Sequence, residues 1–153
     1  MSCHADTHAN MQPFSVQRID HIVLRVRDLP ATVAFYKAVL GCRVARDRPE
    51  LGLIHLTAGA SMIDLVSVGG KLGRVGGVAA GQEGRNVDHI CLRVEPFNET
   101  ELIAHLARFG VNPRDKASSN FGAEGEGLSL YFEDPEGNVI ELKGPPSLAR
   151  SDA

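Results

Sequence analysis

IDHIVLRV, at residues 19–26, decides the fold of this chain, because it recurs almost unchanged as VDHICLRV at residues 87–94. Six of the eight positions are identical, and each copy carries one aspartate, one histidine and one arginine in the same places. A match of this length within 153 residues indicates an internal duplication. The rest of the sequence should then repeat around the two copies.

Both copies predict a strand with one apolar and one polar face, since apolar and polar side chains alternate along them. The histidine and the arginine of each copy lie on the polar face. After the first copy, Asp28 and Gly41 are suited to cap a helix predicted at residues 29–40. Three short strand-like pieces then extend to residue 68, so the first half predicts a βαβββ module.

The second half follows the same plan. Asn98 and Glu101 have the spacing of a helix N-terminus, and an apolar stripe follows them up to Gly110. Residues 111–119 are a weaker strand candidate, whereas GLSLYFED and NVIELKG predict two strands joined by the turn DPEG. A second βαβββ module is therefore expected.

Between the two modules lies a stretch with seven glycines that lacks the GK[ST] ending of a phosphate-binding loop, so nucleotide binding is not expected. The predicted organisation is a flexible leader at 1–16, the first module at 17–68, a glycine-rich linker at 69–86, the second module at 87–144 and a tail at 145–153.

Composition limits the partners. The net charge of −3 and the scattered basic residues give no surface suited to nucleic acid. No apolar run approaches the roughly 20 residues that span a bilayer, so no membrane partner is expected. The N-terminus has neither a basic start nor an apolar stretch, and a cytoplasmic protein is therefore expected.

Two histidines and two acids occupy equivalent places in the repeat. MIDL in the first module corresponds to VIEL in the second, so Asp64 aligns with Glu141 as His21 aligns with His89. If the polar faces of both modules line one cavity, these four side chains converge, and their imidazoles and carboxylates suit Zn, Ni, Co, Fe or Mn. Taken singly, each histidine would be an ordinary strand residue and each acid an exposed strand end.

DHIVLRVRDLPATVAFYKAVLG at residues 20–41 and SLYFEDPEGNVIELKG at 129–144 resemble the vicinal oxygen chelate superfamily, over residues 18–144 in all. That superfamily includes glyoxalase I, fosfomycin-resistance thioltransferases, extradiol dioxygenases and metal-free bleomycin-binding proteins. The resemblance implies an α+β fold in which two tandem βαβββ modules form a curved, cup-like mixed sheet around a metal ion. It also implies a homodimer, because in many members a second subunit completes the cup.

The resemblance implies that His21, Asp64, His89 and Glu141 bind a divalent ion, which the sequence leaves open among Ni, Zn, Co, Mn and Fe. Glyoxalase I enzymes usually have glutamate where this chain has Asp64, and aspartate is one methylene shorter. If Asp64 does not bind the ion directly, two histidines and one carboxylate remain, the set found in the dioxygenases and the fosfomycin enzymes. Both alternatives stay open.

Five further residues are expected at the substrate. Arg25 and Arg85 match positions at which glyoxalase I enzymes contact glutathione carboxylates, and Arg93 lies on the polar face of the second copy. Ser129 and Tyr131 match a pair that fosfomycin thioltransferases use around their substrate. For the two strand arginines, an ion pair with a neighbouring aspartate or a helix end is the alternative.

These residues predict a metal-dependent enzyme of the glyoxalase type, which binds a small, anionic or thiol-conjugated substrate through vicinal oxygens and catalyses isomerase or lyase chemistry. Glu141 is the first choice and Asp64 the second for the catalytic general base. The alternatives are an extradiol-type dioxygenase, a fosfomycin-type thiol transferase and, in another class, a metal-free protein that binds a drug or metabolite. His55 and His105 are expected to be structural or exposed.

Overall fold

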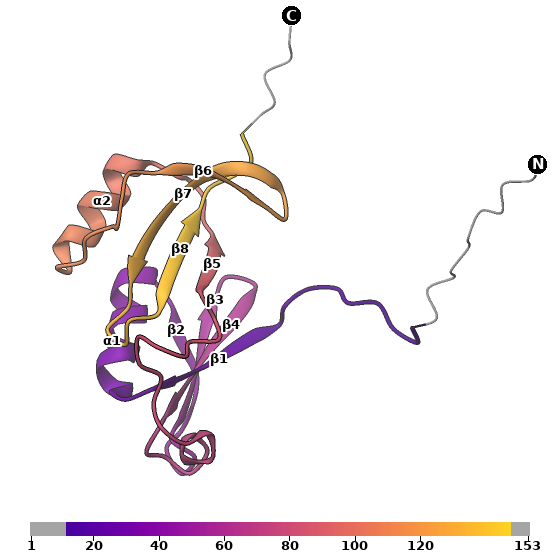
Figure 1. Ribbon diagram of the computed structural model, residues 1–153, viewed down its shortest axis with the longest axis vertical. Coiled ribbons are helices and arrows are strands. Elements are labelled where there is room, and N and C mark those ends of the chain that lie inside the picture. Colours follow the sequence, from indigo (N-terminus) through magenta and orange to yellow (C-terminus); the bar gives the residue numbers. More distant parts are fainter. Residues whose placement is uncertain (1–11, 148–153) are drawn as a thin grey trace, which may run out of the picture.

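The computed structural model describes residues 12–147 and contains two successive βαβββ modules (Figure 1). The first consists of β1 (His21–Val26), α1 (Leu29–Leu40), β2 (Arg43–Arg48), β3 (Leu53–Ala58) and β4 (Ser61–Ser67). The second consists of β5 (His89–Arg93), α2 (Glu99–Arg108), β6 (Ser118–Gly122), β7 (Gly125–Glu133) and β8 (Val139–Lys143). A short 3-10 turn, η1 (Gly73–Gly76), lies between them. The predicted α+β fold of two tandem modules is confirmed.

The predicted boundaries of leader, modules, linker and tail stay predictions. Residues 1–11 of the leader and 148–153 of the tail lie outside the described residues. Within the described part of the chain, neither α-helix is long and apolar enough to cross a membrane.

Local sequence signals determine where the two helices begin. The Asp28 side chain accepts a hydrogen bond from the Ala31 backbone N–H at 2.9 Å, and Asn98 does the same for Glu101 at 3.1 Å. Each bond satisfies an N–H group that has no partner within the helix. At the end of α1, Gly41 adopts the left-handed conformation with φ of 69°, which glycine tolerates without strain.

Each module forms its own four-stranded mixed sheet, in the orders β1-β4-β3-β2 and β5-β8-β7-β6. The first strand of each module runs parallel to the last, and His21 pairs with Met62 as His89 pairs with Val139. In this register Asp64 and Glu141 occupy equivalent places, which confirms the alignment predicted from the repeat.

The strand expected at residues 111–119 lies further along the chain, at β6. Pro113 has no N–H group to give to a strand ladder, and among residues 111–117 only Arg114 donates a backbone hydrogen bond to β7, at Tyr131 O. Regular pairing with β7 begins at Ser118. The loop before it is therefore free to line a cavity.

The apolar faces of both sheets contribute to one hydrophobic cluster. Leu56, Ile63 and Leu65 come from the first module, and Leu130 and Ile140 from the second. Because neighbouring residues of a strand point to opposite faces, the histidines and acids of the repeat lie on the faces turned away from this core. Within one chain the two polar faces therefore point outward from a shared core.

Helix α1 fastens the two modules together, and Figure 1 shows it beside the lower ends of β7 and β8. The rings of Phe35 and Phe132 pack with centroids 6.3 Å apart. The buried Tyr36 hydroxyl donates a hydrogen bond to Asp134 Oδ2 at 2.9 Å, in the turn after β7. These contacts tie α1 of the first module to the end of β7 in the second.

Candidate metal centre and substrate cavities

The polar face of the second sheet brings His89 and Glu141 into contact. His89 Nε2 lies 3.0 Å from Glu141 Oε2, and His89 Nδ1 lies 2.7 Å from Asp88 Oδ2. Because Nδ1 faces Asp88, Nε2 is directed at Glu141, and a proton or a cation is required between Nε2 and the carboxylate oxygen. We call His89, Glu141, Tyr131, Cys91 and Ser129 the Glu141 half-site.

The surroundings of Glu141 keep its side chain ionised although it is only 4% exposed. Burial favours the neutral acid, but the Ser129 hydroxyl, the Cys91 thiol, the Tyr131 hydroxyl and the His89 ring outweigh it, so the pKa of Glu141 lies below its ordinary value. Burial and the Glu141 carboxylate in turn raise the pKa of Cys91 and that of Tyr131 to about 12. Both groups therefore stay protonated at neutral pH.

One buried polar atom of this half-site is unsatisfied. Ser129 is fully buried, and its Oγ, although near enough to Glu141 to lower the pKa of that carboxyl, forms no well-aligned hydrogen bond within residues 12–147. A buried hydroxyl without a partner costs about 1–3 kcal/mol. The position beside Glu141 is the one at which the sequence places a substrate-binding serine, and that role stays a prediction.

The polar face of the first sheet carries the corresponding pair, His21 and Asp64. His21 Nδ1 lies 2.8 Å from Asp20 Oδ1. This contact raises the pKa of His21 above its ordinary value, and the charge of Asp64 acts in the same direction. Asp64 Oδ2 contacts His55 Nδ1 at 2.9 Å, whereas the buried Oδ1 has no hydrogen-bond partner among the residues described. We call His21, His55 and Asp64 the Asp64 half-site.

The chemistry of both half-sites fits a divalent ion. Two donor atoms that each lie about 2.1 Å from an ion, at right angles to each other, are about 3.0 Å apart. His89 Nε2 and Glu141 Oε2 have this separation. In the other half-site Asp64 offers an unpartnered carboxylate oxygen, and a carboxylate at Nδ1 of His21 directs its Nε2 outward.

The four predicted ligands do not meet within one chain. Among residues 12–147, no three histidine, cysteine, aspartate or glutamate side chains lie close enough to hold one ion. The structure brings His89 together with Glu141 and places Asp64 on the face of His21, but the two pairs lie on separate sheets. Each chain thus presents two half-sites.

The three arginines expected at the substrate bind groups of the protein itself. The Arg25 guanidinium donates to backbone carbonyls of the glycine-rich connection, those of Gly73, Gly76, Gly77 and Val78. Arg93 pairs with Glu124 at 2.6 Å and with Glu95 at 3.1 Å, rather than with an aspartate or a helix end. Their contacts with substrate stay predictions.

Arg85 is half-buried and also binds groups of the protein. It donates to Asn138 Oδ1 at 3.1 Å and to Glu136 O at 2.9 Å, which ties the end of the connection to the turn between β7 and β8. Its guanidinium also lines a cavity, so it combines a structural contact with access to a ligand.

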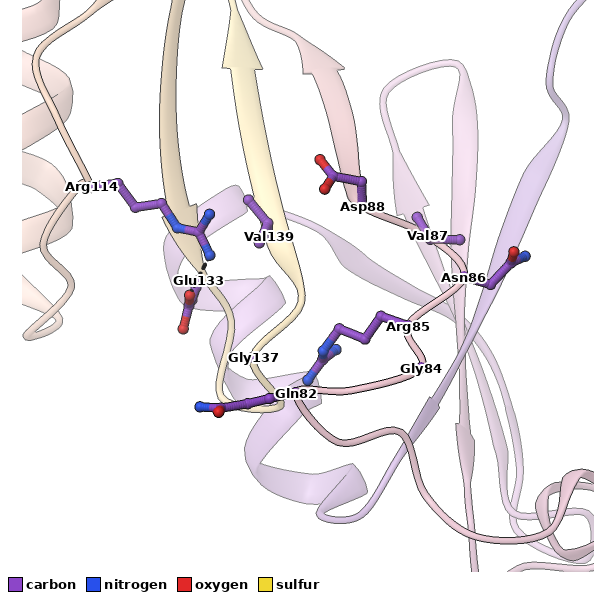
Figure 2. Close-up of a pocket in the computed structure, with 10 residues that line it drawn as sticks. All are labelled: Gln82, Gly84, Arg85, Asn86, Val87, Asp88, Arg114, Glu133, Gly137 and Val139. Carbon is purple, nitrogen blue, oxygen red and sulfur yellow. Dashed lines mark hydrogen bonds and ion pairs between the residues drawn. The ribbon is translucent and has the colours of Figure 1, made fainter.

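One cavity is lined by residues of the Glu141 half-site, and a larger one lies next to it. The larger, of about 560 Å³, lies beside residues 82–88, and Figure 2 shows among its lining residues Arg85 and Arg114, the latter paired with Glu133. The smaller, of about 390 Å³, is lined by His89 and Tyr131. Three residues line both cavities: Asp88, Arg114 and Val139. The cavities are therefore neighbours along one surface that leads from His89 to Arg85.

Sequence reasoning assigned no role in the site to His55 or Arg114. His55 pairs with Asp64 across β3 and β4 as Tyr131 pairs with Glu141 across β7 and β8. Aligning the two hairpins about their turns would have found this equivalence. Arg114 lies in an irregular loop, where no periodic signal exists. His105 is structural as expected, since its Nε2 lies 2.8 Å from Val39 O of α1.

Comparison with known proteins gives the family. The family model described as Glyoxalase/Bleomycin resistance protein/Dioxygenase superfamily matches residues 18–142. A lactoylglutathione lyase of Salmonella typhimurium is 32% identical over 129 residues, which cover 82% of this chain and 90% of that protein. The virulence protein STM3117 of the same organism is 30% identical over 128 residues, or 83% of each chain. An ethylmalonyl-CoA/methylmalonyl-CoA epimerase of Cereibacter sphaeroides is 27% identical over 136 residues, covering 84% and 98%.

Solved structures share the fold. The crystal structure of STM3117 superimposes with a TM-score of 0.70 and 26% identity, over 86% of this chain and 99% of that one. A variant of the fosfomycin resistance protein FosX from Listeria monocytogenes, solved with Mn(II) and a dihydroxypropylphosphonic acid, gives a TM-score of 0.62 at 19% identity, over 88% and 94%. The resemblance noted in the sequence is thus confirmed, and the chain belongs to the glyoxalase/bleomycin resistance protein/dioxygenase superfamily.

Proposed function

We propose that this protein is a divalent-metal-dependent enzyme that catalyses isomerase or lyase chemistry on a small substrate with two adjacent oxygens. The observation that carries the proposal is the pair His89 and Glu141, with 3.0 Å between Nε2 and Oε2 and the histidine held from behind by Asp88. When bound, the ion would act as a Lewis acid on the substrate oxygens.

Glu141 is the proposed general base. Its pKa lies below the ordinary value, so it is ionised at neutral pH and able to accept a proton from a carbon next to a carbonyl. The Tyr131 hydroxyl and the Cys91 thiol are protonated neighbours that are able to donate to the carboxylate. Asp64, the second choice for this role, lies on the other polar face.

We further propose that two copies of the chain complete the site, with the Asp64 half-site of one facing the Glu141 half-site of the other. The support is the shared core, which turns both polar faces of one chain outward. A homodimer would supply His21 and Asp64 from one chain and His89 and Glu141 from its partner, as an ion with four protein ligands requires.

The proposed substrate class is an anionic thiol conjugate. The walls of the two neighbouring cavities carry Arg85, which is bonded to Asn138 and Glu136 O, and Arg114, which is paired with Glu133, and an anionic group would have to share these arginines. The names of two relatives, a lactoylglutathione lyase and a CoA-ester epimerase, denote acidic thiol conjugates. An epimerase is therefore the second candidate within the same chemistry.

A panel of assays tests the proposal. Protein purified without chelator is analysed for bound metal, then reconstituted with Ni, Zn, Co, Mn or Fe. It is next tested on the hemithioacetal of methylglyoxal and glutathione, on methylmalonyl-CoA, on catechol with Fe(II) and oxygen, and on fosfomycin with a thiol. Turnover of the hemithioacetal or the CoA ester supports the proposal, whereas catechol cleavage or thiol addition would replace it with a dioxygenase or a transferase.

The same panel separates enzymes from binding proteins. If the protein contains no metal, takes up none of the five ions and turns over no substrate, the metal-free binding protein becomes the better assignment. The presence of imidazole and carboxylate donors on both polar faces argues for the enzyme.

A further inference from the structure

We propose that His55 is a positioning residue, which holds one carboxylate oxygen of Asp64 so that the other is presented to the metal ion. The inference rests on the proposed function and concerns a residue that neither the sequence motifs nor the fold assigns. His55 Nδ1 lies 2.9 Å from Asp64 Oδ2, and Asp64 Oδ1 is buried without a hydrogen-bond partner among the described residues.

The duplication places His55 where the other module has a protonated partner for its acid. His55 is directly opposite Asp64 in the β3–β4 pair, and Tyr131 is directly opposite Glu141 in the β7–β8 pair. Each carboxylate therefore has, on the neighbouring strand, one side chain able to donate a proton to it. The His55 imidazole of the first module is therefore equivalent in position to the Tyr131 phenol of the second.

Burial makes such a partner necessary. Asp64 is only 5% exposed, and an ionised carboxylate at that depth is destabilised unless its oxygens are paired. His55 Nδ1 is the close polar contact of Oδ2, and Oδ1 is left without a hydrogen-bond partner among the described residues. The charge of Asp64 acts on His21, so the free oxygen and the histidine of the same half-site lie within electrostatic reach.

The contact with His55 matters because the side chain of Asp64 is short. Aspartate has one methylene fewer than the glutamate at the equivalent place, so it reaches less far and must be aimed more accurately to bind an ion. A fixed partner at Oδ2 removes the freedom of the carboxylate to rotate away. His55 thereby converts a short acid into a pre-oriented single-oxygen donor.

Two substitutions separate the positioning role from packing. In His55→Asn the amide nitrogen takes the place of Nδ1 and keeps a donor, whereas His55→Leu keeps the bulk and removes the donor. Metal affinity of each purified protein is measured by competition with a chromophoric chelator, using Zn²⁺ and Mn²⁺. We expect affinity near wild type for His55→Asn and a loss of about 10- to 100-fold for His55→Leu.

A double-variant cycle shows whether His55 acts through Asp64. In an Asp64→Ala background, adding His55→Leu should cause no further loss of affinity, because the oxygen that His55 positions is gone. Equal and additive losses in both backgrounds would overturn the inference. Wild-type metal affinity in His55→Leu would also overturn the inference, but it would not contradict the proposed metal-dependent enzyme.

A second readout does not depend on metal. In the metal-free protein, ¹⁵N correlation spectra of the histidine rings should show His55 protonated at Nδ1. In Asp64→Ala this proton should exchange faster with solvent. A His55 ring protonated at Nε2 alone, and unchanged in Asp64→Ala, would overturn the contact itself. If wild-type protein binds no divalent ion, the proposed function and the ligand role of Asp64 both fail, and the spectra still show whether the pair exists.

Discussion

His89 Nε2 lies 3.0 Å from Glu141 Oε2, across the neighbouring strands β5 and β8. Because Asp88 holds the opposite nitrogen of the same ring, the imidazole is fixed between two carboxylates. This pairing of an oriented histidine with a buried acid is the part of the site that one chain completes alone.

Glu141→Gln should lower kcat by at least 10²-fold while leaving the midpoint of thermal unfolding of the metal-free protein within a few degrees. The amide has the shape of the carboxylate but accepts no proton, and general-base catalysis contributes about 10²- to 10⁴-fold. Steady-state kinetics and thermal unfolding measure the two effects. Glu101→Gln, an exposed glutamate at the start of α2, is the matched control. Full activity in Glu141→Gln would exclude this residue as the base.

His89→Ala should abolish tight binding of divalent ions, since it removes one of the two donors that the second sheet contributes. Bound metal is measured by elemental analysis after dialysis against the ion. His105→Gln serves as control because its amide nitrogen can replace Nε2 at Val39 O, away from both half-sites. Metal retained in His89→Ala at the wild-type level would show that the ligand assignment is wrong.

Mixing two inactive variants should restore activity if two chains build each site. In a dimer of His21→Ala and His89→Ala chains, one site carries both substitutions and the other carries neither. With random exchange, half of the dimers are mixed and one of their two sites is intact, so about one quarter of wild-type activity should return. The assay follows activity after the variants are unfolded and refolded together. No recovery, or a monomeric wild-type protein by light scattering, would contradict the two-chain site.

Tyr36→Phe should lower the free energy of unfolding by about 1–2 kcal/mol at pH 7, because it removes a buried hydrogen bond to Asp134. Burial and the nearby Asp134 raise the pKa of Tyr36 well above its ordinary value of 10.0. The neutral phenol therefore contributes stability that is fully present below pH 10 and is lost as the pH rises toward the folded-state pKa. Urea unfolding at pH 7 and above pH 10 should show a smaller alkaline loss in Tyr36→Phe than in wild type.

Much of the fold was predictable because its signals are local. The caps Asp28 and Asn98 act within three residues, and strand alternation separates the polar from the apolar face over a few residues. The duplicated stretch then aligned Asp64 with Glu141, which the strand registers confirm. The place of β6 was wrong by several residues, since a loop that contains Pro113 has no periodic pattern to read.

The sequence by itself determined the two modules, the polar face of each and the acid that belongs to each histidine, because all three follow from repetition and from the two-residue period of a strand. Only the tertiary structure decided that both apolar faces share one core, that the half-sites of a chain therefore point apart, and that His55 meets Asp64. These relations depend on how helices and sheets pack over distances that no local pattern records.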